Sequence, residues 1–171
     1  MPELPEIEVL RISLHNLVTG SKIEKVKVNN KNLRFKLPRL FEKKLTNNII
    51  TKISRRSKYI IFSLNNNSNL LLHLGMSGII FLVRNNDKKK IKTSFYYDLN
   101  ILPKHNHVLI YLNNGYSLVY NDVRRFGFFK IFNKNNIKKS FLISKLGPEP
   151  LGKFFNYQYF IKSIFGKKKK Y

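Results

Sequence analysis

The second residue of the chain, Pro2, could act as a nucleophile once Met1 has been removed. Proline is small enough for an aminopeptidase to remove the methionine before it, and an α-amino group titrates at about 7.7–8.0. Amines attack sugar or carbonyl carbons and form iminium intermediates. Glu3 and Glu6 would place a proton donor or acceptor beside the amine. The same residues also fit an ordinary helix start, because proline favours the first turn and carboxylates complement the helix dipole.

The elements that must position this segment begin with a helix over residues 4–18, whose apolar residues recur at helical spacing before Gly20. Short alternating or apolar runs separated by Asn-rich turns then predict eight strands. They cover residues 22–29, 49–54, 59–64, 70–74, 78–83, 108–112, 116–120 and 127–132. Asn113-Asn114-Gly115 predicts a hairpin between two of them. The expected fold is α+β, with an N-terminal helix on an eight-stranded antiparallel β-sandwich.

The remaining residues are interpreted as a loop and two helices. Residues 85–98 are charged and lack an apolar period, which is typical of a flexible surface loop, and their lysine run would attract phosphates without specificity. Residues 138–146 are compatible with a short helix ended by Gly147-Pro148. Residues 154–165 predict a further helix, in which Phe155 and Tyr159 are spaced for packing.

The charge of the chain indicates a polyanionic partner. There are 33 Lys plus Arg against nine Asp plus Glu, and the formal net charge is +24. Such a field attracts nucleic acid, whereas an anionic membrane is the poorer partner without a basic amphipathic helix. However, only eight of the basic residues are arginine and alanine is absent. Because this composition is typical of A/T-rich codons, the placement of the basic residues carries more weight than their number.

The composition excludes several other classes of protein. With 171 residues the chain can form one good core and is marginal for two domains. It has no apolar run near the roughly 18–20 residues of a membrane span and no signal-peptide pattern, so we expect a cytoplasmic monomer. The absence of cysteine excludes disulfides and thiolate zinc sites. His105 and His107 have no third ligand in view, so neither a metal site nor a cofactor is expected.

Five segments in one order resemble bacterial formamidopyrimidine-DNA glycosylase, which removes 8-oxoguanine and ring-opened purines from DNA. They are MPELPEIE at the start, RRSKY at 55–59, HLGMSG at 73–78, DVRRFG at 122–127 and LGPEPL at 146–151. The resemblance extends over residues 1–168. The sister family, endonuclease VIII, shares the proline start, but Leu4 and the HLGMSG segment favour the formamidopyrimidine branch.

The resemblance implies catalytic roles for four residues. Pro2 would attack C1′ of the damaged nucleotide, expel the base and hold the sugar as a Schiff base. Glu3 would donate the proton that helps to open the sugar ring, and Glu6 would support the site. Lys58 would act in β-elimination and contact phosphate. Without the motif, Lys58 would be interpreted as an ordinary solvated lysine, one of 25 in the chain.

The resemblance also implies DNA-binding roles for five residues. Met76 and Phe126 would be apolar wedges that fill the space left by the extruded nucleotide. Arg124 would face the orphaned cytosine. His105 and Lys167 would contact the DNA backbone.

Three departures from the family pattern affect these expectations. Val123 replaces a proline, which makes its loop less rigid, and Asn106 replaces an aspartate. Most of the helix–two-turns–helix module and the whole zinc finger are missing. We therefore expect a catalytic β-sandwich domain at residues 1–150 and a remnant of the module, one helix, at residues 151–171, as in a truncated enzyme.

Two functional hypotheses follow from these residues. In the first, the chain is a bifunctional DNA glycosylase and AP lyase that acts on double-stranded DNA containing oxidised purines or abasic sites. In the second, it is a catalytically impaired DNA-binding remnant of that enzyme. The presence of Pro2, Glu3 and Lys58 favours the first hypothesis, and the missing half of the DNA clamp favours the second.

Overall fold

Two antiparallel sheets face each other, as the strand pattern predicts. The computed structural model describes residues 2–86, 90–91, 101–137 and 139–165. The first sheet has the order β1-β7-β8-β5-β6, and the second β2-β3-β4-β9. The strands of the first sheet are β1 (Ile23–Val28), β7 (Asn106–Leu112), β8 (Tyr116–Asp122), β5 (Gly78–Arg84) and β6 (Lys90–Ile91). Those of the second are β2 (Ile50–Arg56), β3 (Tyr59–Leu64), β4 (Ser68–His73) and β9 (Phe128–Asn133).

The predicted sandwich and its eight strands are confirmed, and the described residues add one strand. The two-residue β6 lies inside the segment 85–98, so the prediction of an unstructured loop there is wrong at these two positions. Its pairing with β5 involves Leu82 and Val83. A two-residue strand carries no alternation of its own, which is why the sequence pattern misses it.

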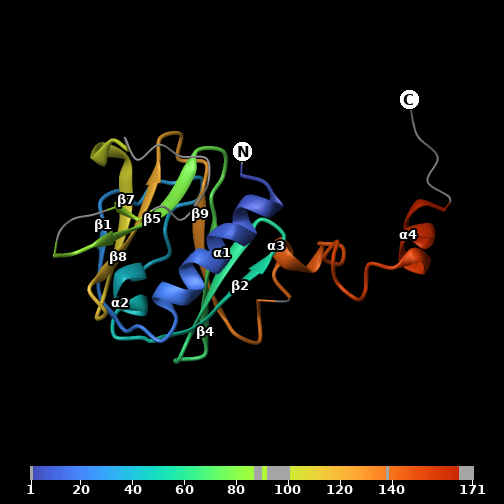
Figure 1. Cartoon of the computed structure of the whole chain (residues 1–171), viewed down its shortest axis with the longest axis horizontal. Coiled ribbons are helices and arrows are strands. Elements are labelled where there is room, and N and C mark those ends of the chain that lie inside the picture. Colours follow the sequence, from blue (N-terminus) through green and yellow to red (C-terminus); the bar gives the residue numbers. More distant parts are fainter. Residues whose placement is uncertain (1, 87–89, 92–100, 138, 166–171) are drawn as a thin grey trace.

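The N-terminal helix α1 (Leu4–Val18) has the predicted bounds within a residue and packs mainly against β2 (Figure 1). One apolar stripe of this helix is buried in the core between the sheets. The stripe consists of Ile7, Leu10, Leu14 and Val18, at helical spacing. Burying such a face contributes most of the stability of a helix of this length, and it fixes the helix start relative to β2 and β3.

Two short elements between the strands were not predicted. The helix α2 (Phe41–Leu45) packs on β1, and the single turn η1 (Pro103–His105) lies beside β8. Both are shorter than the window over which a helical period can be recognised. Phe41 and Leu45 are nevertheless buried, so α2 closes one end of the core.

The C-terminal helices are shorter than predicted. The helix α3 (Phe141–Ser144) lies within 138–146, and α4 (Tyr157–Ile164) lies within 154–165. The Asn156 side chain caps α4 by accepting a hydrogen bond from the Tyr159 amide at 2.9 Å. Figure 1 shows α4 standing apart from the sandwich. Most of its large apolar side chains are exposed, as expected for a helix that lacks the helices of the module to pack against. None of the helices in the described part of the chain has the length and apolarity needed to cross a membrane.

Candidate functional site

The start of α1 brings Pro2 and two carboxylates together. Pro2 is buried and lines a narrow cavity together with Glu6 and Leu74. The Glu6 carboxylate accepts a hydrogen bond from the Glu3 backbone amide at 2.8 Å, which fixes the first turn of the helix. The Glu3 side chain is left exposed and turns toward a different element of the fold.

That element is the tight turn between β2 and β3, which carries Lys58. The Lys58 Nζ atom lies 2.7 Å from Glu3 Oε2, with 29% of the Lys58 side chain and 57% of the Glu3 side chain exposed. The turn places Ser57 in the left-handed region at φ 51°, a conformation that serine rarely adopts. The structure therefore brings together all four predicted catalytic residues: Pro2, Glu3 and Glu6 lie at the helix start, and Lys58 pairs with Glu3.

Beside this turn lies a set of five charged side chains, which we call the Arg55 network: Glu8, Arg11, Arg55, Arg56 and Glu149. Glu8 on α1 accepts hydrogen bonds from Arg11 at 2.7 Å and from Arg55 at 2.7 Å. Glu149 accepts from Arg55 and Arg56, each at 2.7 Å. The network joins three of the family-like segments, at the chain start, at 55–59 and at 146–151.

Both carboxylates of the network have a lowered pKa. For Glu8 the largest cause is the hydrogen bond from Arg11, and burial opposes it. For Glu149 burial raises the pKa, but the Ser57 amide and the guanidiniums of Arg56 and Arg55 together lower it below the ordinary value. Both groups therefore favour the ionised form in the folded chain.

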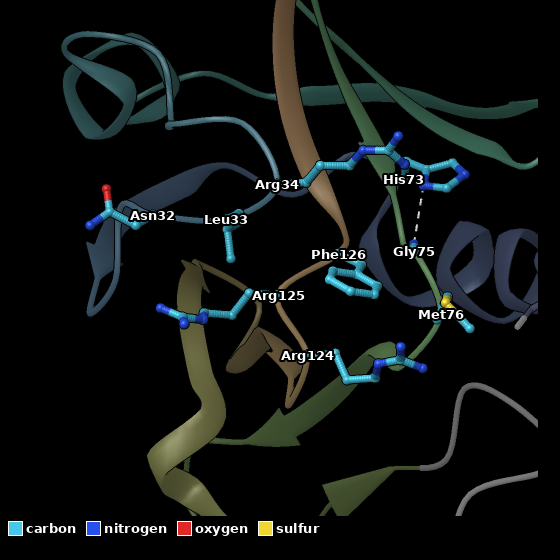
Figure 2. Close-up of a pocket in the computed structure, with 9 residues that line it drawn as sticks. All are labelled: Asn32, Leu33, Arg34, His73, Gly75, Met76, Arg124, Arg125 and Phe126. Carbon is cyan, nitrogen blue, oxygen red and sulfur yellow. Dashed lines mark hydrogen bonds between the residues drawn. The ribbon is translucent and has the colours of Figure 1, made fainter.

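An open groove of about 810 Å³ lies at the same end of the second sheet as the Lys58 turn, since His73, which lines it, pairs with Tyr59 (Figure 2). Its lining comprises Asn32, Leu33, Arg34, His73, Gly75, Met76, Arg124, Arg125 and Phe126. Among these described residues three are arginines and none is acidic, so the groove favours anions. The predicted DNA-binding residues Met76, Arg124 and Phe126 are thus brought together, whereas Pro2 does not line this groove.

The two apolar wedge candidates are solvent-accessible. Met76 is 43% exposed and Phe126 42% exposed. The Arg124 guanidinium carbon lies 4.7 Å from the centre of the Phe126 ring, a cation–π distance. Figure 2 shows Arg124 and Arg125 projecting in opposite directions from the same loop. Large apolar side chains presented in this way are available to a partner, because they are not needed by the core.

The buried carboxylate of Asp122 holds the two loops that carry these side chains. Its Oδ1 accepts a hydrogen bond from the Ser77 hydroxyl at 2.5 Å, and its Oδ2 accepts from the Tyr120 hydroxyl and the Gly127 amide, both at 2.8 Å. The Ser77 hydroxyl in turn accepts from the Arg124 amide at 3.1 Å. Burial, followed by the charge of Asp122, raises the pKa of Tyr120 well above its ordinary value, so its hydroxyl remains a donor.

Glycine is required where the two loops touch. Gly75 has φ +71°, and a Cβ atom there would lie 2.4 Å from the carbonyl carbon of Phe126. At Gly127, a Cβ atom would lie 2.6 Å from the carbonyl oxygen of His73. Contacts this short between a side chain and backbone do not occur, so the glycines of both segments permit the approach of the loops.

His73 connects the groove to the Lys58 turn. It pairs with Tyr59 on β3 and with Phe128 on β9, and its ring stacks on Phe128 at 5.2 Å between centroids. Burial lowers the pKa of His73, and Arg34 and Lys58 lower it further. Its Nδ1 accepts a hydrogen bond from the Gly75 amide at 3.1 Å, the dashed line in Figure 2, which requires that nitrogen to be unprotonated.

The remaining predicted positions lie elsewhere. His105 is half-buried at the end of η1 and does not line the groove. The Asn106 amide oxygen accepts a hydrogen bond from Asn121 at 2.7 Å, so this residue keeps an orienting contact without a charge. Val123, in place of the family's proline, is exposed. Lys167, predicted to contact phosphate, lies outside the described residues.

Sequence reasoning missed several residues at this site. Arg34, from the segment between β1 and α2, lines the groove, although no motif surrounds it. Asp122, His73 and Glu149 lay within the quoted segments, but their roles depend on contacts with distant residues. Among the described residues, no three His, Asp or Glu side chains are grouped so that they could hold a metal ion.

Comparison with known sequences gives matches over nearly the whole chain. A family model described as the formamidopyrimidine-DNA glycosylase N-terminal domain matches residues 1–129. Proteins named formamidopyrimidine-DNA glycosylase from Rhodopseudomonas palustris (strain TIE-1) and Bartonella quintana (strain Toulouse) are 38% and 41% identical over 167 and 172 residues. Each match covers 98% of this chain and 57% of the relative, so the chain spans little more than half of their length.

Solved structures of Lactococcus lactis Fpg also match nearly the whole chain. A complex of Lactococcus lactis Fpg with DNA containing an abasic site matches with a TM-score of 0.78 and 29% identity. It covers 95% of this chain and 55% of that chain. A complex of the same bacterium's Fpg with DNA containing an oxidised pyrimidine matches with a TM-score of 0.76 and 31% identity.

The contact between the two groove loops predicts the effect of adding one methyl group. We expect Gly75→Ala to lower the free energy of unfolding by about 1–3 kcal/mol more than Gly115→Ala does. Both glycines have positive φ, at +71° and +82°, but only Gly75 faces backbone within 4 Å. Urea unfolding followed by circular dichroism measures the difference. Equal losses in the two variants would show that the loops do not meet as described.

The lowered pKa of Glu8 predicts how stability depends on pH. Its stabilising contribution is fully present above the ordinary value of 4.5 and is lost as the pH falls from there through the lowered folded pKa. At neutral pH we expect Glu8→Gln to cost up to about 1 kcal/mol of unfolding free energy. This cost should shrink as the pH falls below 4.5 and through the lowered folded pKa, because the wild-type carboxylate then becomes protonated as well. Glu24→Gln, at an exposed position of β1, is the control, and a cost for Glu8→Gln that stayed constant with pH would contradict the assignment.

Proposed function

The chain belongs to the formamidopyrimidine-DNA glycosylase family, and we propose that it excises oxidised purines from DNA and nicks the resulting abasic site. The observation that carries this proposal is the 2.7 Å contact between Glu3 and Lys58 at the helix start that follows Pro2. A nucleophile, a proton donor and a cation for a phosphate are the groups that such a reaction requires.

In the proposed first step, removal of Met1 frees the Pro2 amine, which attacks C1′ of an extruded nucleotide. The bond from C1′ to the base breaks, and the base departs with the bonding electrons and takes up the proton that the attacking proline nitrogen loses. Glu3 then donates a proton to the ring oxygen, the C1′–O bond opens, and an iminium ion forms between C1′ and the proline nitrogen. Glu6 supports this step by holding the Glu3 backbone.

In the proposed second step, a proton leaves C2′ of the iminium-linked sugar and the C3′–O bond breaks, which expels the 3′ phosphate and nicks the strand. Lys58 is assigned to this elimination, because its ammonium group can stabilise the departing phosphate. Water then hydrolyses the iminium and releases Pro2. These steps use groups of the chain and water only.

The arginine-lined groove supports a double-stranded DNA substrate. Three arginines attract phosphates, and the exposed Met76 and Phe126 can fill the space of an extruded nucleotide, with Arg124 beside them. Extrusion costs a few kcal/mol, part of which such wedges offset. The solved Lactococcus lactis relatives hold DNA with an abasic site or an oxidised base. His105 and Lys167 are proposed to contact the DNA backbone.

A second candidate function is DNA binding with impaired catalysis. It is favoured by the exposed apolar side chains at residues 151–165, which the described part of the chain leaves uncovered. Binding would then rest on phosphate neutralisation and fall steeply with salt. Covalent trapping separates the two candidates, because only a Schiff-base enzyme becomes attached to DNA on reduction.

For the nucleophile, we expect the wild-type chain to be trapped by borohydride on a duplex with 8-oxoguanine and Pro2→Gly to lose most of this trapping. Glycine keeps a terminal amine but loses the secondary amine of the pyrrolidine ring, which forms the iminium more readily. Denaturing electrophoresis of the covalent product measures the yield, and circular dichroism checks the fold. Wild-type yields in Pro2→Gly would place the nucleophile elsewhere, and absence of trapping in the wild-type chain would favour the binding remnant.

For the wedges, we expect Met76→Ala and Phe126→Ala to slow excision of a paired lesion by about tenfold, corresponding to about 1.4 kcal/mol. Cleavage of a pre-formed abasic site should slow less, because its nucleotide is extruded more easily. Single-turnover rates on the two duplexes give the comparison. Ile12→Ala, 48% exposed on α1, is the matched control. Equal slowing on both duplexes would indicate a folding defect in place of a wedge.

A further inference from the structure

The turn that carries Lys58 is anchored by a residue from a distant part of the chain. The Ser57 amide donates a hydrogen bond to Glu149 Oε1 at 2.7 Å, and the Ser57 carbonyl accepts one from Arg55 at 3.0 Å. Both backbone groups of Ser57 are therefore held by the Arg55 network. Since Ser57 has φ 51°, a conformation that costs free energy for serine, these bonds stabilise a turn that the local sequence disfavours.

Glu149 also joins its own segment, residues 146–149, to this turn. Its two carboxylate oxygens accept from Arg55 and Arg56, and the second guanidinium nitrogen of Arg56 donates to the carbonyls of Leu146 and Gly147. One carboxylate thus links the residues that precede α4 to the β2–β3 turn.

The same network holds the helix that carries Glu3. Arg55 donates to Glu8 on α1 at 2.7 Å and to Glu149 at 2.7 Å, so one guanidinium joins the helix to the turn. Neither Glu3 nor Lys58 is buried, and packing alone does not fix their separation. Their relative position depends on how α1 and the turn are held against each other.

We propose that Glu149 is a positioning residue for the Glu3–Lys58 pair, acting through the Ser57 turn. This inference rests on the proposed function, because it assigns Glu149 to the elimination carried out with Lys58. Charge-assisted hydrogen bonds from two arginines and one amide make Glu149 a rigid anchor. Its loss would displace Lys58 without removing any group that touches DNA, and small displacements of reacting groups lower rates strongly.

The test compares Glu149→Gln with the control Glu24→Gln in the full chain, on a duplex with a pre-formed abasic site. We expect Glu149→Gln to slow the single-turnover nicking rate by about tenfold. Its dissociation constant for the same duplex, from fluorescence anisotropy, should remain that of the wild-type chain. A purely structural role of Glu149 would weaken binding and nicking together. A slower nicking rate with an unchanged dissociation constant therefore distinguishes a positioning role from a structural one.

Hydrogen exchange of the Ser57 amide, measured by NMR, gives a second readout that does not need activity. We expect faster exchange in Glu149→Gln than in Glu24→Gln, because the amide loses its carboxylate acceptor. Arg56→Lys keeps the charge but removes the paired contacts to Glu149 and the 146–147 carbonyls. We expect slower nicking and faster Ser57 exchange in this variant too, with smaller changes than in Glu149→Gln. Arg56→Lys therefore provides the test if Glu149→Gln fails to fold.

The outcomes distinguish this inference from the proposed function. A wild-type nicking rate in Glu149→Gln, or unchanged Ser57 exchange, would overturn the positioning role. A wild-type chain that does not nick abasic DNA would overturn the proposed function, and the anchoring of the turn by Glu149 would then be decided by the Ser57 exchange alone.

Discussion

The buried carboxylate of Asp122 is the interaction on which the groove depends. It lies at the end of β8, has no exposed surface, and accepts hydrogen bonds from Ser77, Tyr120 and Gly127. A buried carboxylate must be satisfied by donors, and here two of the three donors, Ser77 and Gly127, belong to the two loops that carry Met76 and Phe126. The loops can approach because glycines face backbone where they meet. The sandwich core therefore determines the shape of the groove, and the exposed side chains are free to contact a partner.

A second set of charges organises the β2–β3 turn of the other sheet. The Arg55 network holds α1 against the β2–β3 turn, and the Glu3–Lys58 pair lies between these two elements. The row of Tyr59, His73 and Phe128, paired across β3, β4 and β9, connects this pair to the groove. The second sheet thus joins the catalytic candidates to the two loops that carry the wedge candidates. This arrangement explains why segments so far apart in the sequence can serve a single nucleotide in the proposed reaction.

Regular elements could be predicted from the sequence because their periodicity is local. The eight strands and α1 carry alternation or a helical stripe, and Asn-rich turns separate them. The elements β6, α2 and η1 are too short to carry such a signal. Contacts between distant segments leave no local trace, so the anchoring of Ser57 by Glu149 and of two loops by Asp122 emerged only from the fold. The family resemblance identified Lys58, which composition would have dismissed, but the roles given to it and to the other site residues remain predictions.

The central claim is that the amine of Pro2 performs the covalent step at this site. Mass spectrometry of peptides from the chain, after borohydride reduction with an abasic duplex, tests it most directly. The account predicts that the sugar remnant is attached to the N-terminal peptide, beginning at Pro2 after loss of Met1. A remnant confined to an internal lysine peptide, such as the one containing Lys58, would contradict it.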